Sequence, residues 1–195
     1  SPNGVTVWFD EETSSDSETI YPARDIGWVV HGEPFDPGTA DLTITADNAY
    51  QLYFNGTNLG SDSSWATAET YPVGLASGKN VIAVRCDDAE GAGAFLADLR
   101  QGGVVVGSGI DWKVSTSGPS GWKTVAFDDS AWDAATGYGA YGVAPWDFNA
   151  GGMPADTPGH WVWSSDRVND NTVFLRGTIT LRAQVCRGGF LFLLK

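Results

Sequence analysis

The sequence lacks the features that mark membrane-spanning and nucleic-acid-binding proteins. No apolar run approaches the roughly 20 residues that a membrane-spanning helix requires, so we expect no membrane insertion. Only 11 Lys and Arg residues are present against 24 Asp and Glu, which gives a formal net charge of −13. A surplus of negative charge repels phosphate backbones. We therefore expect no nucleic-acid partner.

Recognisable catalytic motifs are also missing. The two histidines, His31 and His160, have no nucleophile motif near them, and no G-x-S-x-G, H-E-x-x-H or phosphate-loop pattern occurs. Two distant Cys and two distant His argue against a zinc site. Asp128 and Asp129 could form the acid and base of a glycosidase, but a sequence does not give the separation of two carboxyl groups. We expect the protein not to be an enzyme.

Cysteine is scarce, and the two that occur, Cys86 and Cys186, allow two interpretations. A disulfide closing a loop of about a hundred residues would stabilise the chain by about 4 to 5 kcal/mol in the chain-entropy model and would imply an oxidising compartment. Against this, Cys86 alternates with Ile82 and Val84 on what looks like the buried face of a strand, where a reduced Cys behaves as a small hydrophobe. Both interpretations remain open.

Glycine, proline and tryptophan are abundant, with 25, 9 and 9 residues respectively, and helix-forming runs are few. Short strand-like segments recur at a spacing of roughly ten residues, which is typical of a sandwich or barrel. We predict an all-β protein, with residues 1–183 as a single β-sandwich domain and 184–195 as a tail of unknown role. The segment that follows Asp111 is long, aromatic and poor in regular period, and a loop of this length usually carries function.

The stretch ADNAYQLYFNG, residues 46–56, combines a predicted strand with polar residues at its start. Asn55-Gly56 between apolar runs indicates a tight hairpin turn. Asp47 and Asn48 allow two interpretations: they open the strand that follows, or they form a polar site at a strand edge. We favour the first, and their role in binding a metal stays open.

Three segments resemble the galactose-binding-like jelly-roll domains found beside bacterial glycoside hydrolases and in extracellular adhesins. These are TADNAYQLYFNGTNLG, GKNVIAVRCDD with GAFLADLR, and WKTVAFDDSAWDAATGYGAYG. The third is the most specific, because it repeats the family's pattern of W, a short gap and FDDSxW. The resemblance covers about residues 39–181. It implies a jelly-roll β-sandwich of two antiparallel sheets, often a non-catalytic carbohydrate-binding module with sugar sites on loops at one end and a structural calcium ion.

In such domains the FDDSxW motif is a structural corner, in which the Asp side chains cap backbone amides and the apolar neighbours anchor the loop. A second resemblance, to the anthrax protective-antigen type of lectin domain, rests on Asp47-Asn48 alone. There, paired aspartates hold a calcium ion that in turn holds a sugar. Asn48 departs from that pair.

Sugar sites combine exposed aromatic rings with polar side chains at hydrogen-bonding distance. Trp65 and Trp146 lie in polar, loop-like sequence and are candidate stacking platforms, whereas Tyr138 and Tyr141 either line a groove or pack under a loop. The candidate glycan-binding residues are Trp65, Trp146, Tyr138, Tyr141, Asp147 and Asn149.

Oxygen ligands suited to calcium flank several predicted strand ends, where backbone carbonyls are also free. The candidate calcium ligands are Asp47, Asn48, Asp87, Asp88 and Glu90. Asp98 is a less plausible ligand, because its place in the strand pattern suggests a buried, hydrogen-bonded carboxylate.

We therefore predict an extracellular carbohydrate-binding module, stabilised by calcium and belonging to a larger multidomain protein, whose partner is a glycan or polysaccharide. One alternative is a structural or adhesive spacer domain without a sugar site. Another is a glycosidase fragment.

Overall fold

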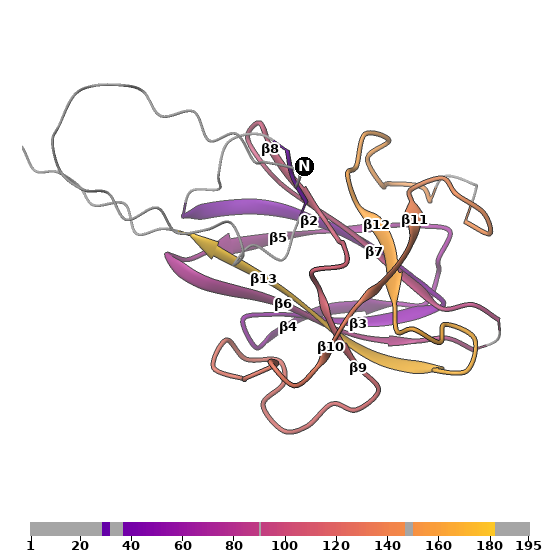
Figure 1. Ribbon diagram of the computed structural model, residues 1–195. Helices are drawn as coiled ribbons and strands as arrows, with labels where there is room; N and C mark the ends of the chain where they lie inside the picture. The colour runs from indigo at the N-terminus through magenta and orange to yellow at the C-terminus, as the bar shows by residue number, and fades with distance from the viewer. Residues whose placement is uncertain (1–28, 32–36, 90, 147–149, 182–195) are drawn as a thin grey trace, which may run out of the picture.

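The alternating segments of the sequence form β-strands in the computed structural model, which describes residues 29–31, 37–89, 91–146 and 150–181. These residues form strands β1 to β13 and no helix. The described part of the chain therefore contains no helix that is long and apolar enough to cross a membrane. The strands form two antiparallel sheets that face each other (Figure 1). The predicted all-β sandwich is confirmed.

The seven-stranded sheet is built around β7. Strand β7 pairs with β2 along one edge, and its other edge pairs with β8 and, through Phe95, with β12. Strands β5, β1 and β11 extend the sheet from β2, β8 and β12. Its members are β1 (Val29–His31), β2 (Gly38–Asp47), β5 (Glu69–Leu75), β7 (Ala94–Gln101), β8 (Val104–Gly107), β11 (Thr136–Ala140) and β12 (His160–Trp163).

The six-stranded sheet has the order β10-β9-β13-β6-β3-β4. Its members are β3 (Ala49–Phe54), β4 (Thr57–Asp62), β6 (Gly78–Asp87), β9 (Lys113–Ser115), β10 (Asp133–Ala134) and β13 (Thr172–Leu181). Strands β6 and β13 pair over their whole length, from Thr172 opposite Asp87 to Leu181 opposite Gly78.

The predicted hairpin turn is confirmed. Asn55 and Gly56 connect β3 to β4 with φ angles of 49° and 87°. Positive φ at both central residues is what a two-residue hairpin turn of the primed type requires, and Asn and Gly reach this region at low cost.

We predicted that Asp47 and Asn48 open a strand together, and this prediction is wrong. Asp47 is the last residue of β2, in the seven-stranded sheet, and β3 of the six-stranded sheet begins at Ala49. Asn48 alone therefore carries the chain from one sheet to the other. The polar pair thus lies at the crossover, with Asp47 at the end of one sheet and Asn48 between the two.

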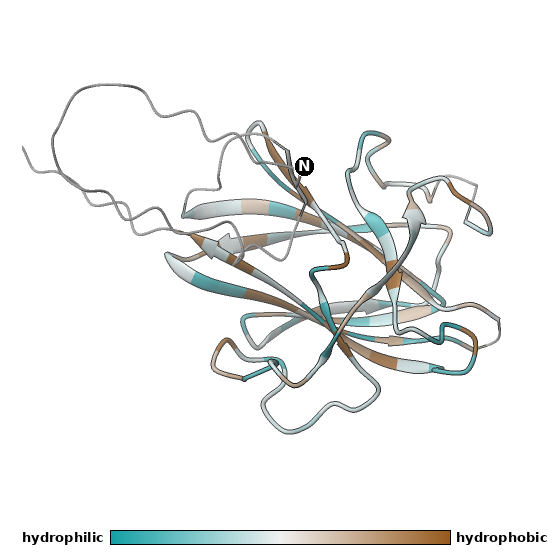
Figure 2. Cartoon of the chain, in the orientation of Figure 1, coloured by the Kyte–Doolittle hydropathy of each residue, from teal (hydrophilic) through white to brown (hydrophobic). Residues whose placement is uncertain are grey.

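The main core lies between the sheets and is formed by the inward face of each strand. Figure 2 shows how hydrophobic and hydrophilic residues alternate along the strands. Ile82, Val84 and Cys86 of β6 are all fully buried. Cys86 is a free thiol whose pKa is raised by burial, as expected for a Cys that packs as a small hydrophobe. Cys186 lies outside the described residues.

Gly177 of β13 faces the same core, where the Trp112 ring takes the space that a side chain would fill. A Cβ atom at Gly177 would lie 2.5 Å from Trp112 Cε2. The glycine that interrupts the apolar alternation of this strand is therefore required by packing.

The long aromatic segment after Asp111 covers the outer faces of both sheets. Trp122 packs on Tyr53, Val81 and Ala83, outside the six-stranded sheet. Trp146 packs outside the seven-stranded sheet, in a cluster with Trp161, Leu96, Ala94, Ala150 and Met153. Much of this segment therefore completes the sandwich, and it buries part of the outer face of each sheet.

Candidate functional site

The predicted site residues that the structure describes gather at one end of the sandwich, where β2 passes to β3. The backbone N–H of Asn48 donates to the carbonyl of Asp87 at 3.1 Å. Its side-chain Oδ1 accepts from the backbone N–H of Ala89 at 2.6 Å. The end of β6 is thus held against the crossover. We call this group, Asp47, Asn48, Asp87, Asp88 and Trp146, the crossover corner.

Asp47 is fixed by two donors. The indole Nε1–H of Trp146 donates to Oδ2 at 2.9 Å, and Nδ2 of Asn48 donates to Oδ1 at 2.7 Å. Burial raises the pKa of the Asp47 carboxyl, and the Trp146 hydrogen bond opposes that rise only in part. A half-buried carboxylate held by an indole is well oriented, because neither partner can turn without losing the bond.

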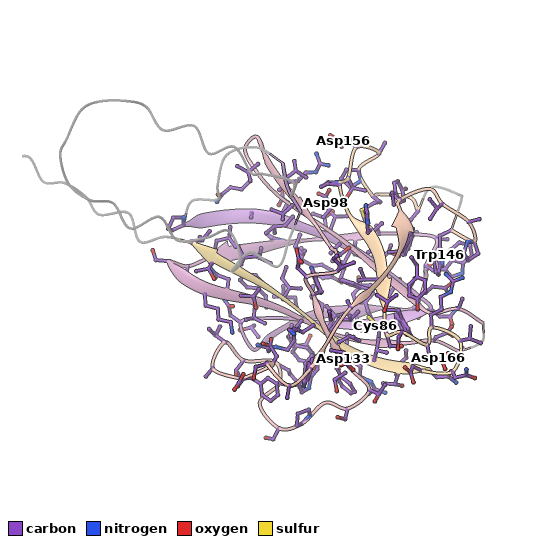
Figure 3. The ribbon with its side chains drawn as sticks, in the orientation of Figure 1. Cys86, Asp98, Asp133, Trp146, Asp156 and Asp166 are labelled. Atoms are coloured by element: carbon purple, nitrogen blue, oxygen red, sulfur yellow. The ribbon has the colours of Figure 1, made fainter. Side chains whose placement is uncertain are left out.

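Trp146 is not the exposed stacking platform that we predicted from its polar sequence context. Only 1% of its surface is exposed, and its ring stacks on Trp161 with the centroids 5.0 Å apart. Figure 3 shows Trp146 at the same end of the ribbon as Asp166. Its role is to cover the outer face of the seven-stranded sheet and to orient Asp47.

The two predicted tyrosines are half-buried and fasten neighbouring loops. Tyr138 donates to the carbonyl of Ser164 at 2.7 Å, and Tyr141 donates to the carbonyl of Ala150 at 3.1 Å. The guanidinium of Arg167 lies 4.6 Å from the Tyr138 ring centroid and 5.4 Å from that of Trp146. Of our two interpretations for these tyrosines, packing under a loop fits these contacts.

Trp65, another predicted aromatic residue, is partly exposed. Its carbonyl accepts from Oγ1 of Thr45, two residues before Asp47, at 3.3 Å. Two backbone hydrogen bonds hold the loop that contains Trp65 against Gly151. The N–H of Gly151 donates to the carbonyl of Ala66 at 2.8 Å, and the N–H of Ala68 donates to the carbonyl of Gly151 at 2.7 Å.

The predicted calcium ligands supply oxygen atoms of the right kind, and several of those atoms already accept hydrogen bonds. Besides the Asp47 and Asn48 contacts, Oδ1 of Asp87 accepts from Thr172 at 2.7 Å and from Arg85 at 2.9 Å. Asp88 is 6% exposed. Within the described part of the chain, no three Asp, Glu, His or Cys side chains are arranged to hold a metal ion. A calcium site here would need the Asn48 amide oxygen and main-chain carbonyls as well.

Three predicted site residues lie outside the described residues: Glu90, Asp147 and Asn149.

Asp128 and Asp129 have structural partners. Oδ1 of Asp128 accepts from the backbone N–H of Ser130 at 3.0 Å, which confirms the expected cap. The expected cap by Asp129 is not formed among the described residues. Its Oδ2 instead accepts from Nε of the buried Arg176 at 2.7 Å. A carboxylate committed to a buried guanidinium is a poor candidate for an acid or base. The expected buried carboxylate of Asp98 is also confirmed, because Asp98 is 0% exposed and paired with Arg100 at 2.7 Å.

No family model matches the chain. It is 32% identical over 157 residues to an alpha-L-rhamnosidase of Streptomyces avermitilis, a match that covers 72% of this chain and 15% of the rhamnosidase. A crystal structure of S. avermitilis alpha-L-rhamnosidase complexed with L-rhamnose superposes with a TM-score of 0.52 and 29% identity, over 61% of this chain and 13% of that chain. The β-sandwich is therefore similar in sequence and fold to one part of a much longer protein.

A Pleurotus ostreatus lectin also matches, in its apo form and in complex with GalNAc. The TM-scores are 0.49 and 0.46, with 28% and 29% identity, and both matches cover 56% of this chain and 34% of the lectin chain.

Proposed function

We propose that the chain is a non-catalytic carbohydrate-binding domain of a larger extracellular protein that acts on glycans. The observation that carries the proposal is the match to only 15% of an alpha-L-rhamnosidase. A segment this short, folded as a β-sandwich, fits an accessory domain beside a catalytic one. L-rhamnose, with which the matched enzyme structure is complexed, is accordingly the first sugar to test.

The crossover corner is the proposed sugar site. A pyranose presents hydroxyl groups at its edge and C–H groups on its faces, so it needs fixed polar partners and an accessible ring. Asp47 and Asn48 supply a carboxylate and an amide whose orientations are set by Trp146 and Ala89. Trp65, a partly exposed residue whose carbonyl is bonded to Thr45 two residues before Asp47, would supply the ring. Asp128 bonds the backbone amide of Ser130 and Asp129 bonds the buried Arg176, and these structural roles favour binding without turnover over the glycosidase alternative.

Binding should depend on Asp47 and Asn48. We expect Asp47→Asn and Asn48→Ala each to weaken the affinity for L-rhamnose, or for a glycan that ends in it, by about tenfold to a hundredfold, since each change removes a charged or oriented hydrogen-bonding group. Isothermal titration calorimetry on the folded proteins would measure this. Asp41→Asn makes the same change at an exposed position of the same strand and should bind as the unaltered chain does.

Unchanged affinity in both corner variants would place the sugar elsewhere. A chain that binds neither L-rhamnose nor any glycan on an array would instead favour the spacer alternative, which the burial of Trp146 also suits.

Calcium is the second part of the proposal. The oxygen groups of Asp47, Asn48 and Asp87 would hold the ion together with main-chain carbonyls, because calcium takes six to eight oxygen ligands in flexible geometry. When bound, calcium would supply a positive charge that attracts sugar hydroxyl oxygens.

A thermal melt tests the calcium proposal. Millimolar calcium should raise the midpoint of unfolding, because a ligand that binds only the native state stabilises it, and a chelator should reverse the rise. Magnesium at the same concentration is the control, since it demands a smaller octahedral site. The rise should shrink in Asp47→Asn. Identical midpoints with and without calcium would remove the ion from the proposal and leave the sugar site to be judged by calorimetry.

A further inference from the structure

A cavity of about 480 Å³ lies beside strands β9 and β10. Figure 3 labels Asp133, one of its lining residues, at a distance from Trp146. The walls of the cavity come from the end of β9, from β10 with the residues before it, and from residues 164–171, which connect β12 to β13. The residues that matter here are Thr116, Trp132, Asp133, Ser164, Ser165 and Asp170. Its volume falls within the range of known ligand pockets.

The residues that line the cavity include one aromatic residue, several residues with hydroxyl groups and two with carboxylates. Trp132 is partly exposed, and Asp133 is exposed. Within the described residues, the carboxylates of Asp133 and Asp170 accept no hydrogen bond from a protein donor, so both are available to a ligand. An indole face with several hydroxyls and carboxylates suits a neutral sugar, which has C–H faces and hydroxyl edges.

The Trp132 ring is held in position by two neighbouring aromatic rings. Its ring centroid lies 6.5 Å from that of Trp122, in a stacked arrangement, and 5.6 Å from that of Phe127, in an edge-to-face arrangement. Nζ of Lys113 donates to the Trp132 carbonyl at 3.1 Å. A ring fixed by its neighbours loses little freedom when a ligand stacks on it, which favours binding.

The connection 164–171 separates this cavity from the crossover corner. Its residue Arg167 faces the corner, where its side chain lies over the Trp146 and Tyr138 rings and its carbonyl accepts from Gly93 at 2.8 Å. Ser164 and Asp170, at the two ends of the same connection, line the cavity.

We propose that this cavity is a second saccharide-binding site, in which a pyranose stacks on Trp132 and its hydroxyls bind Asp133 and Asp170. The ligand class rests on the proposed function, whereas the site is independent of the crossover corner. Two sugar sites on one domain would let it hold two parts of the same polysaccharide. The overall affinity for the polysaccharide would then exceed the affinity of either site alone.

The test is an NMR titration of the whole chain with L-rhamnose. The indole N–H signals of the 9 tryptophans report on their surroundings. Trp132→Phe identifies the Trp132 signal, and the backbone amide of Ala89 reports on the corner. We expect both signals to shift. In Asp47→Asn the Trp132 shift should persist. In the double variant Asp133→Asn with Asp170→Asn, the affinity measured from the Trp132 signal should fall at least tenfold, and the Ala89 shift should stay intact.

The outcomes separate the two proposals. A shift at Ala89 with none at Trp132 overturns the cavity site and keeps the proposed function. A Trp132 shift that the double variant leaves unchanged also overturns it. No shift at either position, together with no binding to any glycan on an array, overturns both. Because Trp132→Ala would disturb the packing on Trp122, the Asp→Asn changes, which keep size and shape, carry the test.

Discussion

Replacing Arg176 with alanine is expected to lower the free energy of unfolding by about 3 to 5 kcal/mol, the range seen when one partner of a buried ion pair is removed. Arg176 is 1% exposed on the outer side of β13. Its Nε donates to Asp129, and its Nη atoms donate to the carbonyls of Trp122, Thr124 and Phe127. Alanine would leave all four acceptors without this donor.

The control for this prediction is Arg85→Ala. Arg85 pairs with Asp87 at 2.9 Å, but the two side chains are 47% and 40% exposed. A solvent-exposed pair contributes about 0 to 1 kcal/mol, so this variant should lose little stability. Urea unfolding followed by tryptophan fluorescence would measure both. Equal losses in the two variants would show that the guanidinium of Arg176 does not hold the loop that carries Trp122.

Replacing Trp146 with alanine should also cost about 3 to 5 kcal/mol of stability, because it opens a large cavity on the outer face of the seven-stranded sheet. The variant would lose the stacking on Trp161 and leave Leu96 and Met153 without a cover. The same urea titration measures this loss.

The companion variant Trp146→Phe separates packing from the hydrogen bond. It keeps an aromatic ring in the cluster, although a smaller one, and removes the Nε1–H that donates to Asp47. We expect a smaller loss of stability, about 1 to 3 kcal/mol, together with weaker sugar binding, because Asp47 would lose the donor that orients it. Wild-type affinity in this variant would show that the orientation of Asp47 does not depend on Trp146.

Local features were predicted correctly where neighbouring residues alone decide the outcome. Asn55-Gly56 forms the expected turn because its backbone preference does not depend on distant contacts. Cys86 is buried because it lies on the same side of its strand as Ile82 and Val84, which face the core. The Asp128 cap likewise bonds an amide only two residues away.

The errors concern residues whose surroundings are made by distant segments. Trp146 was expected to be exposed because its sequence neighbours are polar, yet it is buried by β12 and by the outer face of β7. A signal for this was present: the run AFLA at the start of β7 is apolar on both faces, which is typical of a strand that is covered on both sides. Nothing in the sequence said which residues would cover it.

By itself, the sequence determined the strand pattern, the hairpin turn and the all-β class, since periodicity, turn chemistry and the scarcity of helix-forming runs act over a few residues at a time. Only the tertiary structure decided that Asp47 and Asn48 carry the chain between two sheets, that Asp129 meets Arg176, and that Trp132 borders a cavity. These placements depend on contacts between segments far apart in the chain, and such contacts are fixed by how the two sheets and their covering loops pack together.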